Sequence, residues 1–333
     1  MAAMRKFFRS SATSQPSFLS PHLWRFFSNR NQRGLNTLSY EEIQVSENPC
    51  KYTAFIFHGF LGSCRNWRSF SRHLLSSFQS GSDWRMVLLD LRNHGKSAEI
   101  GGFDPPHTMK SAALDVANLL KSKSWSWPDV VIGHSMGGKI ALQFAESCAQ
   151  GDYGESATLP EQLWVLDSVP GEVNPSDGEV ENVLRTLQSI PVPIPSRRWL
   201  VDHMVKLGFS KAISEWIGTN LKKAGSSGEQ MVWSFDLNGA VEMFNSYWKE
   251  SYWPLLENPP QGLEIKVVRA EKSDRWTPSV LHQMENLVSK GEEQGKGNVS
   301  YHILKDAGHW VHVDNPKGLI DIMAPHLESL SKP

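Results

Sequence analysis

The sequence predicts an α/β fold in which a mostly parallel central sheet is flanked by helices. Short apolar segments of three to six residues recur along the chain, and amphipathic stretches with helical spacing separate them. Most of the apolar segments are continuous rather than alternating, which is typical of strands that helices bury on both faces. The 333 residues, of which 40% are hydrophobic and 21% charged, are enough for one large domain with a full core.

The expected elements can be followed along the chain from these segments. Between the second and third strands, Met109–Lys121 places Ala, Val and Leu residues at helical spacing, which predicts an amphipathic helix. The alternation stops at about residues 170–262, which hold no clear strand and are dense in Trp and Met. We therefore expect a helical cap inserted after the strand that ends at Asp167. The predicted strands are Ala54–Phe57, Met86–Leu89, Val130–Ile132, Leu163–Leu166, Ile265–Val268 and Val299–Leu304.

Residues 1–40 differ in composition from the rest of the chain. They contain no Asp or Glu, and their six Lys and Arg residues are spread among serines and aromatic residues. A basic, acid-free, Ser-rich N-terminus is typical of organelle transit peptides, and Arg25–Ser28 resembles a mitochondrial processing site. We expect residues 1–40 to be a transit peptide, cleaved or disordered, that directs the protein to the mitochondrion. The chloroplast and a disordered basic tail are the alternatives.

The charge and cysteine content argue against several function classes. The 34 Lys and Arg residues nearly balance the 35 Asp and Glu residues, whereas nucleic-acid-binding proteins carry a basic excess. The three cysteines fit neither a disulfide framework nor a zinc site, which favours a reducing compartment. No apolar run reaches the roughly 18–20 residues of a membrane-spanning helix. We expect no nucleic-acid partner, no metal, no cofactor and no transmembrane segment.

A G-x-S-x-G pattern, Gly133–Gly137, lies between an apolar strand and a helix-forming segment. This strand–turn–helix context is that of a nucleophile elbow, in which a sharp turn exposes a serine. The glycines relieve the clashes of that turn, and the positive end of the following helix favours an anion near Ser135. The sequence therefore predicts Ser135 as a nucleophile, with a glycine-rich structural turn as the alternative.

A serine nucleophile needs a base and N–H donors for the oxyanion that it creates. The turn after the last expected strand supplies His309 as the base, because the glycine before it lets the turn direct the ring inward. One donor should be the amide of Met136, directly after Ser135. The other should be the amide of Phe60, in a loop where Gly59 allows the backbone to approach the substrate.

Four segments together carry a resemblance to a known family: HGFLGS at His58–Ser63, DLRNHGKS at Asp90–Ser97, GHSMGGK at Gly133–Lys139 and GHWVH at Gly308–His312. The chain resembles the α/β-hydrolase superfamily. More narrowly, it is similar to the alpha/beta hydrolase domain-containing protein 11 group, as a plant-like organellar member, and to related small bacterial esterases. The resemblance spans about Ala54 to the C-terminus and is weaker in the cap. It implies an α/β-hydrolase domain over residues 41–333, a serine hydrolase of acyl esters, lipid esters such as diacylglycerol as substrates, and a mitochondrial location.

The acid that would orient His309 has two candidates. The general topology of the superfamily favours the turn after Ile265–Val268, where Asp274 is available. The narrower group carries the acid at the strand end that matches Asp167, together with a serine that matches Ser273 and no aspartate after it. This sequence has an aspartate after that serine, so both carboxylates remain candidates.

The leading function that these residues indicate is a carboxylesterase or lipase-like reaction through an acyl-serine intermediate, with a small-molecule or lipid ester as substrate. A thioesterase or carbon–carbon hydrolase would use the same three groups. A non-catalytic ligand receptor built on the same fold is the alternative from a different class. The sequence leaves the acyl length, the head group and the oligomeric state open.

Overall fold

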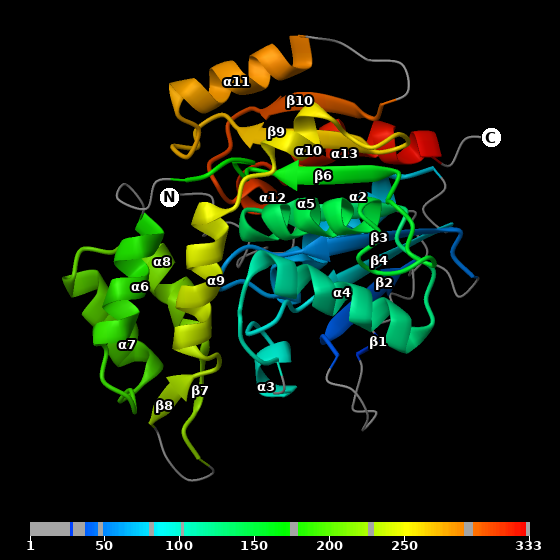
Figure 1. The fold of residues 1–333 in the computed structure, drawn as a ribbon. Coiled ribbons are helices and arrows are strands. Elements are labelled where there is room, and N and C mark those ends of the chain that lie inside the picture. The colour runs from blue at the N-terminus through cyan, green and yellow to red at the C-terminus, as the bar shows by residue number, and fades with distance from the viewer. Residues whose placement is uncertain are drawn as a thin grey trace, which may run out of the picture.

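The centre of the computed structural model is an eight-stranded sheet in the order β1-β2-β4-β3-β5-β6-β9-β10 (Figure 1). The structure describes residues 27–28, 37–45, 49–79, 83–100, 103–173, 179–225, 230–289 and 296–330. β1 and β2 pair antiparallel with their neighbours, and the strands from β4 to β10 run parallel. All six predicted strands are present, which confirms the predicted fold class. The strands are β1 (Phe27–Ser28), β2 (Tyr40–Gln44), β3 (Tyr52–Phe57), β4 (Trp84–Leu89), β5 (Val130–His134), β6 (Gln162–Leu166), β9 (Glu264–Ala270) and β10 (Asn298–Leu304).

Helices bury both faces of the sheet. On β3, Phe55 and Phe57 belong to the core on one face, whereas Ala54 and Ile56 belong to the core on the other. Because both faces are covered, the strand is apolar at consecutive positions from Ala54 to Phe57 rather than at alternate positions. The first face is covered by α4 (Met109–Lys123), α5 (Met136–Ala149) and α11 (Pro278–Ser289), and the second by α2 (Arg68–Ser77) and α13 (Pro316–Leu330). Short helices η1 (Cys64–Trp67), α3 (Ser97–Ile100) and α12 (Val311–Asp314) lie in the connections.

The chain between β6 and β9 forms a mostly helical segment that lies beside the sheet layers (Figure 1). It also contains an antiparallel hairpin, β7 (Leu221–Lys223) with β8 (Met231–Trp233), so the expectation that this segment holds no strand was wrong. Strands of three residues are too short to show an alternating pattern in the sequence. The helices of this segment, hereafter the cap, are α6 (Glu179–Ser189), α7 (Arg197–Lys206), α8 (Lys211–Gly218), α9 (Leu237–Lys249) and α10 (Trp253–Glu257).

The buried side chain of Lys139, on α5, ties the cap to the core. Its ammonium donates to three backbone carbonyls of the cap, those of Gly171 (2.7 Å), Tyr247 (2.5 Å) and Glu250 (2.7 Å). Burial lowers the pKa of Lys139 to about 7, although the negative charges of Glu250 and Glu172 oppose this shift. The ammonium group has three N–H bonds, and each can donate to one of these carbonyls. The residues at both ends of the cap are therefore hydrogen-bonded to α5, the helix that follows Ser135.

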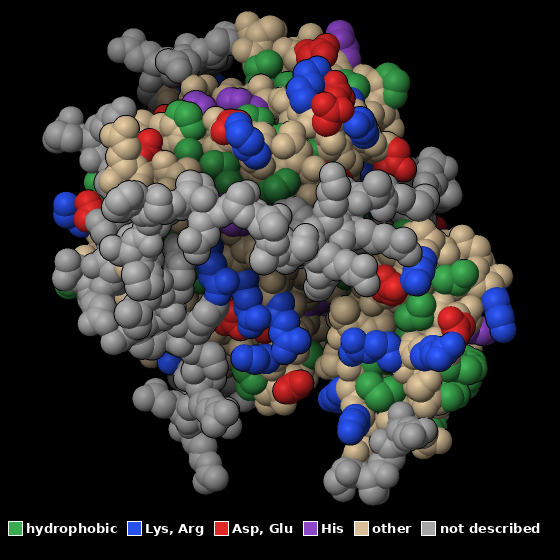
Figure 2. All heavy atoms as spheres, turned by 180° about the vertical axis from the view of Figure 1, so that it is seen from behind, with side chains coloured by type: hydrophobic (Ala, Val, Ile, Leu, Met, Phe, Trp, Pro, Cys, Tyr) green, Lys and Arg blue, Asp and Glu red, His purple; other side chains and the backbone are tan. Residues whose placement is uncertain are grey.

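The predicted transit segment lies mostly outside the described residues. In the described part, Phe27–Ser28 pairs with β2 at the edge of the sheet, and Leu38 and Tyr40 are buried in the core, so the fold includes residues before the expected boundary at residue 41. None of the helices that the structure describes is long and apolar enough to cross a membrane. On the face shown in Figure 2, basic and acidic side chains are interspersed on the visible surface.

Candidate active site

Ser135 lies at a sharp turn between β5 and α5. Its backbone has φ 53° and ψ −120°, a conformation that L-residues rarely adopt and that is associated with functional sites. The turn depends on two glycines. A Cβ at Gly133 would lie 2.2 Å from the carbonyl oxygen of Gly137, and a Cβ at Gly137 would lie 2.4 Å from the carbonyl oxygen of Phe57. The sequence around Ser135 therefore folds as a nucleophile elbow.

The imidazole of His309 is bonded to the carboxylate of Asp167. Nδ1 of His309, in the turn after β10, lies 2.7 Å from Oδ2 of Asp167, which directly follows β6. Asp167 also accepts from the hydroxyl of Ser273 (2.8 Å), the indole N–H of Trp276 (2.9 Å) and the amide of Ala270 (3.1 Å). Four donors surround a fully buried carboxylate, so the carboxylate and the ring are held in one geometry.

These contacts also set the charge of the pair. Burial raises the pKa of Asp167, but the hydrogen bonds from His309, Ala270 and Ser273 overcome it, and the pKa lies below its usual value. The pKa of His309 is lowered, first by burial and then by the positive charge of Arg275, against the opposing effect of Asp167. A neutral imidazole beside an ionised carboxylate is therefore the favoured state at neutral pH.

The second acid candidate, Asp274, has a different position. It is exposed and lines the same pocket as His309. Among the described residues, however, Asp167 is the only carboxylate that accepts a hydrogen bond from the His309 ring. Its charge nevertheless acts on His309, where it opposes the lowering of the pKa. The structure thus brings Asp167 and Ser273 together with His309 and leaves Asp274 at the pocket wall.

The loop after β3 comes close to Ser135. A Cβ at Gly59 would lie 3.3 Å from Cβ of Ser135 and 3.0 Å from Nδ1 of His134, so the backbone passes close to both residues and a side chain there would be crowded. Phe60 follows at the pocket wall. Met136 is the first residue of α5, where backbone N–H groups have no partner within the helix. The residues that carry the two predicted N–H donors thus line the same pocket as Ser135.

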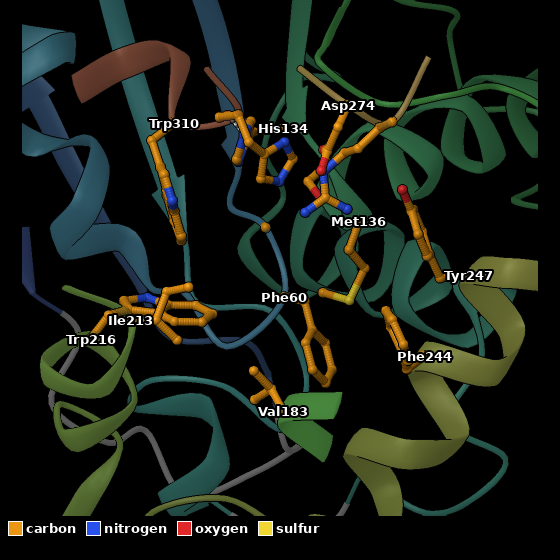
Figure 3. Close-up of a pocket in the computed structure, with 14 residues that line it drawn as sticks. Phe60, His134, Met136, Val183, Ile213, Trp216, Phe244, Tyr247, Asp274 and Trp310 are labelled. Carbon is orange, nitrogen blue, oxygen red and sulfur yellow. Dashed lines mark hydrogen bonds between the residues drawn. The ribbon is translucent and has the colours of Figure 1, made fainter. Parts of the chain in front are cut away.

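The pocket in front of Ser135 combines an apolar wall with a polar end. Figure 3 shows Phe60, Val183 and Ile213 gathered at one end of the pocket, and His134 and Asp274 at the other. The cap contributes much of the apolar wall. The lining residues from the cap are Val183, Ile213, Trp216, Phe244 and Tyr247.

Comparison with known families decides the assignment. The family model described as "Alpha/beta hydrolase family" matches residues 54–322. The chain belongs to the alpha/beta hydrolase family. The chain is similar to the sn-1-specific diacylglycerol lipase ABHD11 of Mus musculus, with 25% identity over 82% of this chain and 80% of the relative. The corresponding protein of Danio rerio is 24% identical over 83% of this chain and 78% of its own length.

Among solved structures, a marine microorganism esterase superposes on this α/β hydrolase with a TM-score of 0.66. The two share 21% identity over 87% of this chain and 98% of that one. This likeness shows the fold. The family and the relatives together make the chain a hydrolase.

The structure of this α/β hydrolase adds three polar residues that the motifs alone did not indicate. His134, inside the G-x-S-x-G pattern, donates from Nε2 to the carbonyl of His309 at 2.7 Å and so fixes the backbone that carries the ring. Tyr247 and Arg275 also line the pocket. Only His134 had a signal in the sequence, namely its place beside Ser135, because Tyr247 and Arg275 reach the pocket through the tertiary fold.

Proposed function

We propose that the chain is a serine hydrolase of carboxylic esters. The observation that carries the proposal is that His309, which lines the same pocket as Ser135, is hydrogen-bonded to the buried carboxylate of Asp167. The names of the relatives, a diacylglycerol lipase and an esterase, agree with it. The elbow at Ser135 and the neutral state of His309 are the two features that nucleophilic attack requires.

In the proposed mechanism, neutral His309 removes the proton of the Ser135 hydroxyl as its oxygen attacks the ester carbonyl. The amides of Phe60 and Met136 stabilise the oxyanion. The alcohol leaves with the proton from His309, and an acyl-serine remains. Water then attacks the acyl group, passes a proton through His309 to the serine oxygen and releases the acid.

Asp167 is the proposed acid of this mechanism. Its bond to Nδ1 fixes the tautomer in which Nε2 accepts the serine proton, and its charge stabilises the imidazolium that follows. Ser273 donates to Oδ2, the same carboxylate oxygen that the ring contacts, and Trp276 donates to Oδ1, so both are positioning residues.

The apolar lining favours an ester with an apolar acyl group, and lipid esters are the proposed substrate class. Aromatic and aliphatic side chains such as Phe60, Trp216 and Phe244 give an acyl chain the surface on which it would be desolvated. The diacylglycerol lipase name of the mouse relative points in the same direction.

The proposal is tested by labelling with a fluorophosphonate probe, which reacts with activated serines. Wild type should be labelled and Ser135→Ala should not, whereas Ser279→Ala, an exposed serine on α11, should label like wild type. Hydrolysis of oxygen esters and matched thioesters of increasing acyl length then separates an esterase from a thioesterase. A folded wild type that neither labels nor hydrolyses any of these substrates would leave the receptor alternative.

We also propose that residues 1–40 direct the protein to the mitochondrion, with the chloroplast as the alternative. The acid-free, basic composition supports this proposal. A fluorescent protein fused after residue 40 would report the destination, and replacement of Arg5, Lys6 and Arg9 by Gln should abolish import.

A further inference from the structure

The side chain of Arg275 lies at the pocket and forms no hydrogen bond or ion pair with the residues that the structure describes. Arg275 lines the same pocket as Ser135 and His309. Its Nε is buried and has no hydrogen-bond partner, and among the described residues its side chain takes part in no ion pair. Two other arginines are ion-paired, since Arg92 lies 2.6 Å from Asp115 and Arg85 lies 3.3 Å from Glu42. A buried Nε–H without an acceptor is costly for folding alone, which indicates a ligand at this side chain.

The loop that carries Arg275 is fixed on both sides of it. Ser273, two residues before, and Trp276, directly after, both donate to the carboxylate of Asp167. These two bonds hold the loop after β9 against the end of β6. The backbone at Arg275 is therefore held by the same carboxylate that holds His309, which keeps the side chain at the pocket that Ser135 lines.

The charge of Arg275 acts inside the pocket. After burial, it is the second contribution that lowers the pKa of His309, and it lowers the pKa of His134 as well. The neighbouring Asp274 is exposed, so water screens its carboxylate more strongly than it screens the partly buried guanidinium. The polar end of the pocket thus presents a positive group to a ligand that reaches Ser135.

We infer that the preferred ester carries an anionic group, a carboxylate or a phosphate, which binds Arg275 while the scissile carbonyl lies at Ser135. This inference rests on the proposed esterase function and makes its substrate class narrower. The substrate would have two unlike parts. Its apolar part would lie against the side chains shown at the other end of the pocket in Figure 3, and its anion would form charge-assisted hydrogen bonds with the guanidinium.

The test compares matched pairs of esters that differ in the anion. The first pair places a carboxylate on the acyl side: the 4-nitrophenyl half-ester of glutaric acid against 4-nitrophenyl valerate. The second pair places a phosphate on the alcohol side: 1-oleoylglycerol 3-phosphate against 1-oleoylglycerol. The quantity measured is the ratio of kcat/KM for the anionic ester to that for the neutral ester, and the pair with the higher ratio identifies the source of the anion.

Arg275→Met should lower this ratio about 10- to 100-fold in at least one pair, the range expected for one charge-assisted contact in a shielded site. Arg275→Lys should lower it less, because the charge is kept and the two-pronged geometry is lost. Arg198→Met, on the outer face of α7 with a side chain 93% exposed, should leave the ratio as in wild type. A ratio that stays within twofold of wild type in both Arg275 variants and both pairs overturns the inference.

A binding measurement separates this inference from the proposed function. In Ser135→Ala, the indoles of Trp216 and Trp310 in the pocket wall should report ester binding by fluorescence. The anionic ester should bind more tightly than its neutral partner, and Ser135→Ala/Arg275→Met should lose that preference. If wild type does not hydrolyse esters but this preference is found, the esterase proposal fails and the anion site stands. If wild type hydrolyses neutral esters without the preference, the anion site fails and the esterase proposal stands.

Discussion

The sheet and the cap contribute to the pocket in different ways. The three side chains proposed for the reaction follow strands: Ser135 and Asp167 stand directly after β5 and β6, and His309 lies in the turn after β10. The cap contributes apolar side chains from three helices, α6, α8 and α9, together with Tyr247. A strand end is fixed by the backbone hydrogen bonds of its neighbours, whereas a helix surface can change by substitution without moving the backbone.

This difference indicates that the sheet determines the geometry of the reaction and that the cap determines which substrates fit. Distances that a reaction depends on, such as the 2.7 Å between His309 and Asp167, are set in the sheet. The shape of the apolar wall is set in the cap. Changes in the sheet should therefore alter turnover for every substrate, and changes in the cap should alter the order of preference among substrates.

The largest effect is expected from the carboxylate in the sheet. Asp167→Asn removes the charge beside His309 and favours the wrong tautomer of the ring, so kcat should fall about 10³- to 10⁴-fold for every ester. Asp274→Asn, at the exposed pocket wall, serves as the matched control and should change kcat far less. Steady-state kinetics of both variants on one ester checks this prediction, and the reverse order of effects would reassign the acid.

The next effect concerns the attachment of the cap. Lys139→Met leaves the carbonyls of Gly171, Tyr247 and Glu250 buried without their donor, so the free energy of unfolding should fall by about 3 kcal/mol. Urea denaturation measures this change. Lys211→Met, on the exposed surface of α8, is the matched control, and an equal loss in both variants would contradict a specific anchoring role for Lys139.

A smaller effect is expected from the cap wall. Ile213→Trp narrows the pocket without touching a strand end, so kcat/KM for long acyl chains should fall about tenfold relative to short ones. A graded series of nitrophenyl esters shows the shift. A uniform loss across the series would mean that this helix surface supports the reaction itself, and the division between sheet and cap would not hold.

The smallest effect is a shift in the pH profile. Because burial and Arg275 lower the pKa of His309, the acid limb of kcat/KM should lie below pH 6.5, with full activity above it as the ring becomes neutral. Arg275→Met removes a positive charge that disfavours the protonated ring, so the limb should move to higher pH. Asp167 and Asp274 act in the opposite direction and remain in both proteins. A limb that moves to lower pH in Arg275→Met would contradict this electrostatic picture.

The parts of the site that could be predicted from the sequence are those encoded by adjacent residues. Ser135 is recognisable because the glycines that its turn requires stand next to it, and His309 because it follows a glycine after the last strand. The acid could not be decided in this way. Asp167 and Ser273–Asp274 follow β6 and β9, which are parallel neighbours, so both reach the same edge of the sheet and only the three-dimensional arrangement selects one.

The fold shows the same division. Continuous apolar strands such as β4 and β5 were predictable because burial on both faces leaves a local pattern in the sequence. The hairpin β7–β8 and the burial of Leu38 were not, since three-residue strands and a few apolar residues beside a basic segment carry no periodic signal. The unpaired guanidinium of Arg275 was equally hidden, because a sequence does not show which charges lack partners.

The carboxylate of Asp167 lies where the chain leaves the sheet for the cap, and its donors Ala270, Ser273 and Trp276 lie where the chain has returned from it. The residues just before and just after the cap are therefore held together by hydrogen bonds at the ends of β6 and β9, and none of these bonds involves a cap residue. A cap of another length or shape could be spliced between these junctions while the carboxylate and His309 keep their positions. We therefore expect that replacing the cap as a unit, in evolution or in the laboratory, would change the substrate range around an unaltered reaction centre.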